Sequence, residues 1–110
     1  MSRTHVALGT IALAMLTAGA ASAQDVAAGA KVFADQKCSL CHSIAGKGNT
    51  KGPLDEVGGR PAAEIRAWLE DAPGMTAKTN AARKPAMKAY TLPKGDIDAL
   101  VAYLSTLKKK

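Results

Sequence analysis

The segment Cys38-Ser39-Leu40-Cys41-His42 limits what this chain can fold into more than any other feature. It places two thiols three residues apart and an imidazole directly after the second, which is the attachment signature of c-type haem. Two thiols about one helical turn apart can each add to one vinyl group on the same porphyrin edge. The adjacent imidazole then points at the iron. The motif therefore predicts one covalent haem c held by Cys38, Cys41 and His42.

Other uses of two cysteines at this spacing fit the chain less well. A thioredoxin-like redox pair would need a βαβ context, and no alternating strand pattern surrounds the motif. A structural zinc site would need four ligands, whereas residues 24–110 contain no third cysteine and no second histidine. A plain disulfide stays open as an alternative, but it leaves His42 unexplained.

The first 23 residues have the pattern of an export signal. Arg3 gives a positive start, residues 6–16 are mostly apolar and uncharged, and Ala21 and Ala23 supply small residues at the positions that a signal peptidase reads. We therefore expect a signal peptide over residues 1–23, cleavage before Gln24 and a mature domain over residues 24–110 in the periplasm. The apolar run is shorter than the roughly 18 residues of a membrane span, although retention as an anchor stays open.

The mature chain is poor in the side chains that build a core. Only 20 residues from Gln24 onward are Val, Ile, Leu, Met, Phe, Trp or Tyr. Small scaffolds with so little apolar area usually need a metal, a crosslink or a bound group, so the cofactor is expected to fill the centre. The chain has four Phe, Trp and Tyr residues in total, which argues against a nucleic-acid binder that stacks bases.

The apolar spacing predicts an all-α domain. Asp25 is the expected N-cap of a first helix that ends near the cysteines. Pro61 suits the first turn of a second helix, which we expect Pro73 and Gly74 to stop. The last helix carries its apolar residues on one stripe, with acids at its start and lysines at its end: Ile97, Leu100, Val101, Leu104 and Leu107. Residues 43–59 and 76–94 are expected to be mostly irregular, and no segment predicts a strand.

Four stretches, in this order, resemble the small class I c-type cytochromes over nearly all of residues 24–110. They are residues 29–33 with the motif at 38–42, Gly52-Pro53-Leu54 with Val57 and Gly59-Arg60, Met87-Lys88-Ala89-Tyr90, and residues 97–104. The resemblance implies a small cytochrome c fold, in which three or four helices and their loops wrap around one covalent haem.

The sixth iron ligand is a separate question. His42 is the only histidine after residue 23, so a second histidine of the same mature chain is excluded, and methionine, lysine, water or an empty position remain. The mature chain contains two methionines, Met75 and Met87. Met87 precedes the last helix in a context that resembles the ligand loop of the family, and we favour it. The family run Met-Pro-Ala-Phe is replaced here by Met-Lys-Ala-Tyr. Because of this difference, an open sixth position stays an alternative.

Other roles come from the resemblance alone. It implies that the Pro53 carbonyl accepts a hydrogen bond from the His42 imidazole, although an ordinary turn would also explain this proline. It implies that Arg60 lies near the haem carboxylates, against the alternative of a solvated side chain, and that Trp68 contacts the porphyrin or simply packs in the core. A close crossing of the first and last helices is implied for Gly29, Phe33 and Tyr103.

The resemblance implies a one-electron carrier between a dehydrogenase and an oxidase or reductase, and not an enzyme. The alternative is a haem c subunit of a specific periplasmic dehydrogenase complex, and a weaker one is a gas-sensing haem protein. The expected partners are redox proteins, and the protein is either a monomer or part of a heterocomplex. An acidic partner surface would suit five lysines expected near the haem edge, although they also suit a generally solvated surface: Lys37, Lys47, Lys51, Lys84 and Lys88.

Overall fold

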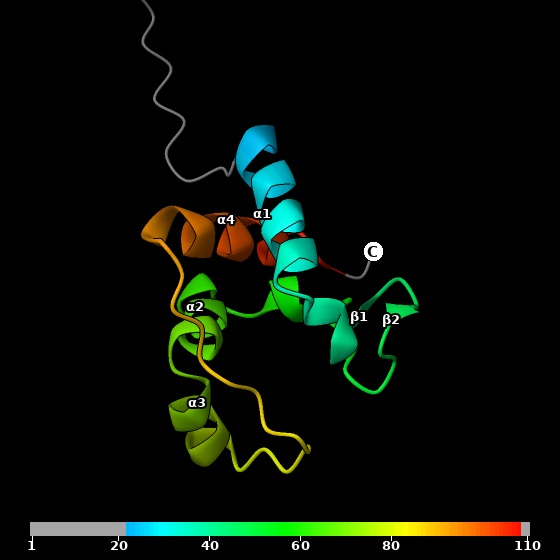
Figure 1. Cartoon of the computed structure of the whole chain (residues 1–110), viewed down its shortest axis with the longest axis vertical. Helices are drawn as coiled ribbons and strands as arrows, with labels where there is room; N and C mark the ends of the chain where they lie inside the picture. Colours follow the sequence, from blue (N-terminus) through cyan, green and yellow to red (C-terminus); the bar gives the residue numbers. More distant parts are fainter. Residues whose placement is uncertain (1–21, 109–110) are drawn as a thin grey trace, which may run out of the picture.

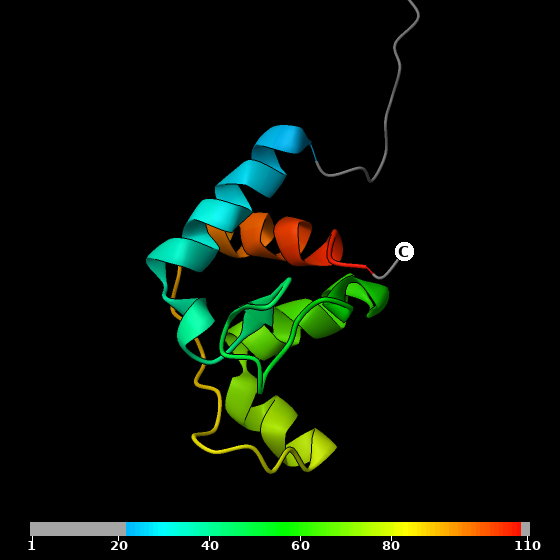
Figure 2. The same cartoon turned by 90° about the vertical axis from the view of Figure 1, so that its right-hand side faces the viewer.

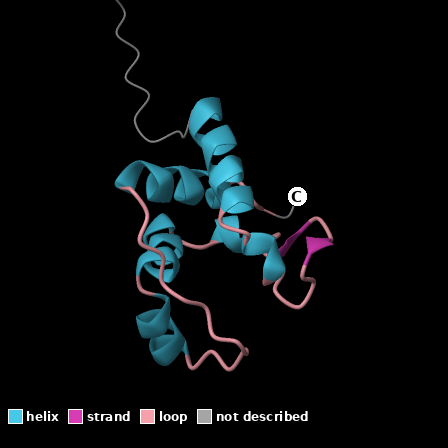
Figure 3. Cartoon of the chain, in the orientation of Figure 1, coloured by secondary structure: helices cyan, strands magenta, loops and turns pink. Residues whose placement is uncertain are grey.

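The computed structural model describes residues 22–108. In that part of the chain, four α-helices and two short 3₁₀ turns, joined by loops, account for nearly all regular structure (Figure 3). The predicted all-α class is confirmed. One addition is a small antiparallel hairpin that the sequence did not predict, formed by β1 (Ser43–Ile44) and β2 (Lys47–Gly48).

The first and last helices, α1 (Ala23–Asp35) and α4 (Lys94–Ser105), cross in close contact (Figures 1 and 2). Gly29 lies at the crossing, where a Cβ would overlap the Ala99 carbonyl oxygen and lie 2.5 Å from the Tyr103 Cβ. Beside it, the rings of Phe33 and Tyr103 meet edge to face with centroids 5.9 Å apart. The predicted crossing through Gly29, Phe33 and Tyr103 is therefore confirmed.

The start of α1 differs from the prediction. Asp25 was expected to cap the helix, but the helix begins at Ala23, and the Ser22 hydroxyl accepts a hydrogen bond from the Asp25 backbone N–H at 3.2 Å. Serine and aspartate are both good capping residues. The serine lies three residues before the N–H that it accepts from, which is the spacing that a cap requires.

The core lies between α4 and α2 (Ala62–Glu70), which begins directly after Pro61. The predicted apolar stripe of the last helix faces inward, with Leu107 partly buried at its end. The buried cluster consists of Ile65 and Leu69 from α2 and of Ile97, Leu100, Val101 and Leu104 from α4. Because both helices direct these side chains to one side of α4, the opposite side remains free for the crossing with α1.

The region after α2 corrects the prediction. Pro73 and Gly74 do not stop a helix; α2 ends at Glu70, and a new helix, α3 (Ala72–Thr79), contains both residues in its first turn. The Asp71 carboxylate accepts a hydrogen bond from the Gly74 N–H at 3.2 Å and caps this helix. A proline in a first turn loses no hydrogen bond, because those N–H groups have no partner within the helix. Residues 76–79 are thus helical, and irregular backbone begins at Asn80, whose φ is 54°.

The hairpin turns through two residues with left-handed backbone, Ala45 (φ 51°) and Gly46 (φ 78°), as two-residue hairpin loops require. It follows the 3₁₀ turn η1 (Cys38–Leu40). A second 3₁₀ turn, η2 (Val57–Gly59), fastens the loop beyond the hairpin to the end of the last helix, because the Gly58 N–H donates to the Leu107 carbonyl at 2.8 Å. These contacts hold the motif at residues 38–42 at one end of the α2–α4 core.

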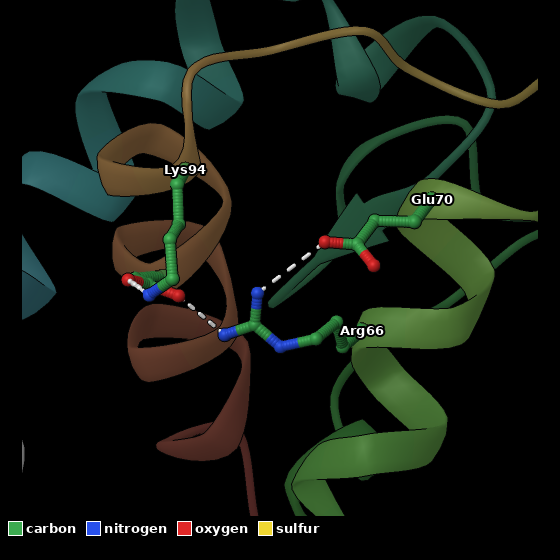
Figure 4. A network of polar contacts seen from close by, with 4 residues as sticks. Arg66, Glu70 and Lys94 are labelled. Atoms are coloured by element: carbon green, nitrogen blue, oxygen red, sulfur yellow. Dashed lines mark hydrogen bonds and ion pairs between the residues drawn. The ribbon is translucent and has the colours of Figure 1, made fainter.

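A polar network joins α2 to α4 beside the core (Figure 4). The Arg66 guanidinium donates to Asp98 Oδ1 at 2.5 Å and to Glu70 Oε1 at 3.4 Å, and Lys94 Nζ donates to Asp98 Oδ2 at 2.8 Å. The hydrogen bonds from Lys94 and Arg66 hold the pKa of Asp98 below its usual range. These side chains are solvent-accessible, so we expect the network to orient the helices more than it stabilises them.

The Asp98→Asn substitution tests this network through its pH dependence. A carboxyl whose pKa is lower in the folded protein stabilises the fold above its unfolded-state pKa, and the contribution is lost as pH falls through the folded-state pKa. We therefore expect a small decrease in Tm at pH 7 that vanishes in acid, measured by circular dichroism. Asp96→Asn removes the same charge from the same end of α4 and is the matched control. An identical pH dependence of the two variants would contradict the assignment.

Two glycine-to-alanine substitutions in helices should change the free energy of unfolding in opposite directions. Gly29→Ala places a methyl group against the α4 backbone and should lower the free energy of unfolding by about 1–3 kcal/mol. Gly95→Ala, in the first turn of α4, meets nothing within 4 Å and should raise it by about 0.5–1 kcal/mol. Chemical denaturation measures both effects. A Gly29→Ala variant as stable as wild type would mean that the helices cross less closely than described.

Candidate functional site

A cleft of about 1810 Å³ opens beside the α2–α4 core. Ligand sites in proteins typically measure about 300–1,000 Å³, so this space suits a large group. Several residues of the buried core also line this cleft. Its apolar lining includes Phe33, Leu54, Ile65, Trp68, Leu69, Leu100 and Leu104.

The predicted haem-binding residues line this cleft together. After α1, Lys37 adopts left-handed backbone (φ 56°), and the chain turns sharply into η1. At the end of η1 the backbone N–H groups of Cys41 and His42 both donate to the Cys38 carbonyl, at 3.2 and 2.9 Å. Cys38, Cys41 and His42 therefore lie on one wall, and both thiols are free of a disulfide.

A hydrogen bond fixes the tautomer of His42. Its Nδ1 lies 3.1 Å from the Gly52 carbonyl oxygen, and because a carbonyl can only accept, Nδ1 carries the proton and Nε2 keeps its lone pair. Burial lowers the pKa of His42 below its ordinary value, although the bond to Gly52 works against this, so the ring is neutral at pH 7. A neutral imidazole with one free nitrogen is the form that binds a metal.

The acceptor of this bond corrects the prediction that named the Pro53 carbonyl. The Gly52 carbonyl, one residue earlier, accepts both from the His42 ring and from the Ser43 N–H, the latter at 3.1 Å. The next bond of the same pairing runs from the Leu54 N–H to the Ser43 carbonyl at 2.8 Å. Parallel pairing of residue 43 with residue 53 therefore directs the Gly52 carbonyl toward the ring. Pro53 itself still lines the cleft.

Residues 81–93 supply another part of the cleft lining. Met87 lies in this segment, is partly buried against the core and lines the cleft. The segment is held at Tyr90, whose backbone N–H donates to the Leu69 carbonyl at 2.9 Å. Met75 lies in α3 instead; it is 9% exposed and borders a separate, smaller hollow between α2 and α3. Met87 and His42 thus share the cleft, and Met75 is absent from its lining.

Arg60 and Trp68 also line the cleft. The guanidinium of Arg60 pairs with Glu64 one helical turn away at 2.7 Å and remains largely exposed. Its role toward haem carboxylates stays a prediction. Four of the five highlighted lysines line the cleft as exposed side chains, namely Lys37, Lys51, Lys84 and Lys88, whereas Lys47 lies on β2 outside the lining.

Sequence reasoning missed three residues that shape the site. The Asn49 side chain donates to the Leu40 carbonyl at 3.2 Å, and its backbone N–H donates to the Ser39 carbonyl at 3.0 Å. Tyr90 lies near Cys38 and Cys41, and burial, with those thiols, raises its pKa. Arg83 lies against Gly52. The sequence offered a signal for two of them, because Asn49 lies just before the Gly52 turn and Tyr90 ends the stretch of residues 87–90 that resembles the family. Arg83 belongs to no periodic pattern.

These groups fit a covalently attached haem. Two free thiols, a neutral imidazole and a thioether border one apolar cleft, and this donor set matches the soft and imidazole ligands that haem iron accepts. Within the described residues, no helix is both long and apolar enough to cross a membrane. The fold and the cleft together define a small helical haem protein.

Comparison with known proteins agrees with this class. The family model for Cytochrome c matches residues 26–108, and the chain belongs to this family. Members bind haem c covalently, typically one in a domain of this size, and act as electron carriers. Neither the curated proteins nor the solved structures gave a match. The predicted family, the small cytochrome c fold and the haem c cofactor are confirmed.

Proposed function

We propose that the protein is a periplasmic carrier that moves one electron at a time between a dehydrogenase and an oxidase or reductase. The observation that carries the proposal is that His42 and Met87 line the same apolar cleft while both thiols of the motif remain free. Haem c, when bound, supplies a reversible one-electron couple.

Each residue of the site has a definite task in this proposal. Cys38 and Cys41 hold one edge of the cofactor, and His42 offers Nε2 to the iron because its Nδ1 proton is engaged by Gly52. Met87 offers a neutral thioether, a ligand that raises the reduction potential when it stands opposite histidine. A filled sixth position also keeps small molecules off the iron, which suits a carrier and disfavours a gas sensor.

The proposed periplasmic location rests on the first 23 residues, of which 1–21 lie outside the described part of the chain. Support comes from their positive start, apolar run and small residues at the cleavage position. Cleavage before Gln24 would remove Ser22, which caps α1 in the whole chain. Asp25 is then the first residue of a preferred capping type in the shortened helix.

A transient partner suits the surface around the motif. Leu40 lies between the two cysteines and is 70% exposed, the one large hydrophobic side chain so exposed among the described residues. Exposed lysines surround the cleft, so a partner with acidic groups around an apolar centre would be attracted and oriented. A permanent subunit usually presents a larger apolar interface, so a free carrier is favoured over a fixed subunit of a dehydrogenase complex.

Intact-mass analysis of protein recovered from a periplasmic extract tests both attachment and export. We expect the mass of residues 24–110 plus one haem, with pigment that survives acid–acetone extraction because two thioethers hold it. The Cys38→Ala variant should retain one thioether and mature poorly, whereas Ser39→Ala, between the same cysteines, should mature normally. Haem that extracts freely, or Met1 still present in a membrane fraction, would contradict the proposal.

The two methionines give a matched pair of variants. Met87→Ala should abolish the weak sulfur-to-iron band of the ferric spectrum, lower the potential and admit carbon monoxide, because the thioether is lost. Met75→Ala should keep the band and lower the free energy of unfolding by about 2–5 kcal/mol, as expected for a buried methionine. Visible spectroscopy and chemical denaturation measure these outcomes. A band that depends on Met75 would reverse the ligand assignment, and one that depends on neither would remove methionine from the iron.

A further inference from the structure

Arg83 reaches from the Met87 segment to the turn that holds His42. A Cβ added to Gly52 would overlap the Arg83 guanidinium, with Cζ 2.8 Å away, and would also overlap the Cys41 carbonyl oxygen. The guanidinium therefore occupies the space that the absent Gly52 side chain leaves. Gly52 is the residue whose carbonyl accepts the His42 proton, so the positive charge lies beside the peptide that orients the imidazole.

This charge has no carboxylate to neutralise it in the described part of the chain. The ion pairs there are formed by Arg60, Arg66 and Lys94, and Arg83 takes part in none of them. Arg83 also lines the same cleft as His42, so its charge faces the space that the cofactor would fill. An uncompensated cation at this position makes any further positive charge in the cleft less favourable.

We infer that Arg83 raises the reduction potential through its charge, by holding a fixed cation against the Gly52 turn beside His42. The inference rests on the proposed carrier function and deepens it. Loss of an electron adds one positive charge to the site, so the oxidised state is disfavoured by a nearby cation. Arginine suits this role because its guanidinium is always charged and its planar face can lie on a peptide.

Three variants separate charge from structure. Arg83→Gln removes the cation and keeps a polar side chain, Arg83→Lys keeps the charge, and Lys78→Gln removes one charge from an exposed position of α3 outside the cleft lining. Spectroelectrochemical titration of each holoprotein gives the midpoint potential, and the ferric spectrum reports whether the sulfur-to-iron band is intact.

We expect Arg83→Gln to lower the midpoint potential by at least about 18 mV. At 59 mV per tenfold change, this corresponds to a twofold change in the ratio of reduced to oxidised protein. The band should persist, Arg83→Lys should keep most of the wild-type potential, and Lys78→Gln should change it less than Arg83→Gln does. Because Arg83 is exposed, the difference should shrink with added salt.

Equal potentials for Arg83→Gln and Lys78→Gln would overturn the inference, because the effect would then be one of net charge. A loss in Arg83→Lys as large as that in Arg83→Gln, or disappearance of the band in Arg83→Gln, would also overturn it, since Arg83 would then act through shape or through Met87. In each case a reversible wild-type couple leaves the carrier function intact. A wild-type protein without covalent haem overturns the proposed function, and this inference with it.

Discussion

The hydrogen bond from His42 Nδ1 to the Gly52 carbonyl is the contact on which the rest of the site depends. It selects the tautomer with a free Nε2 and holds the ring at one orientation, and it needs only backbone on the acceptor side. Gly52 can supply that carbonyl because it has no side chain to collide with Cys41 and Arg83. The segments that contain His42, Gly52 and Arg83 thus meet at this glycine. Any larger residue there would displace the Arg83 guanidinium and press against the Cys41 carbonyl.

The helix crossing and the residues that line the cleft have different roles in the fold. Gly29 allows α1 to lie close against α4, which fixes the position where η1 begins. On the other side, Ile65, Leu69, Leu100 and Leu104 belong to the core and also line the cleft. Side chains that face a cleft of this size lack packing partners on that side, so a bound apolar group completes the core. Cofactor binding and folding are therefore coupled in this chain.

Features set by short-range spacing could be predicted from the sequence, and those set by competition between segments could not. The motif at residues 38–42 and the stripe of α4 depend on residue type and period, whereas the crossing at Gly29 was implied by the resemblance to the c-type cytochromes; the structure confirms the stripe and the crossing. Pro73 was misread because a proline that ends one helix and a proline that begins the next look alike until Asp71 is recognised as a cap. The contact of Arg83 with Gly52 depends on the path of a loop that no local pattern determines.

The path of that same loop bears on whether Met87 or Met75 is the better candidate for the iron ligand. In the described part of the chain, residues 82–92 make one backbone hydrogen bond, from the Tyr90 N–H to the Leu69 carbonyl. The segment is otherwise held by the packing of Met87 and Leu92 on the core and by the contact of Arg83 with Gly52. An iron–sulfur bond at Met87 would add a fixed point midway between Arg83 and Tyr90. Met75 lies in α3, a helix with its own cap and backbone bonds, so a ligand there would leave this segment with no further restraint.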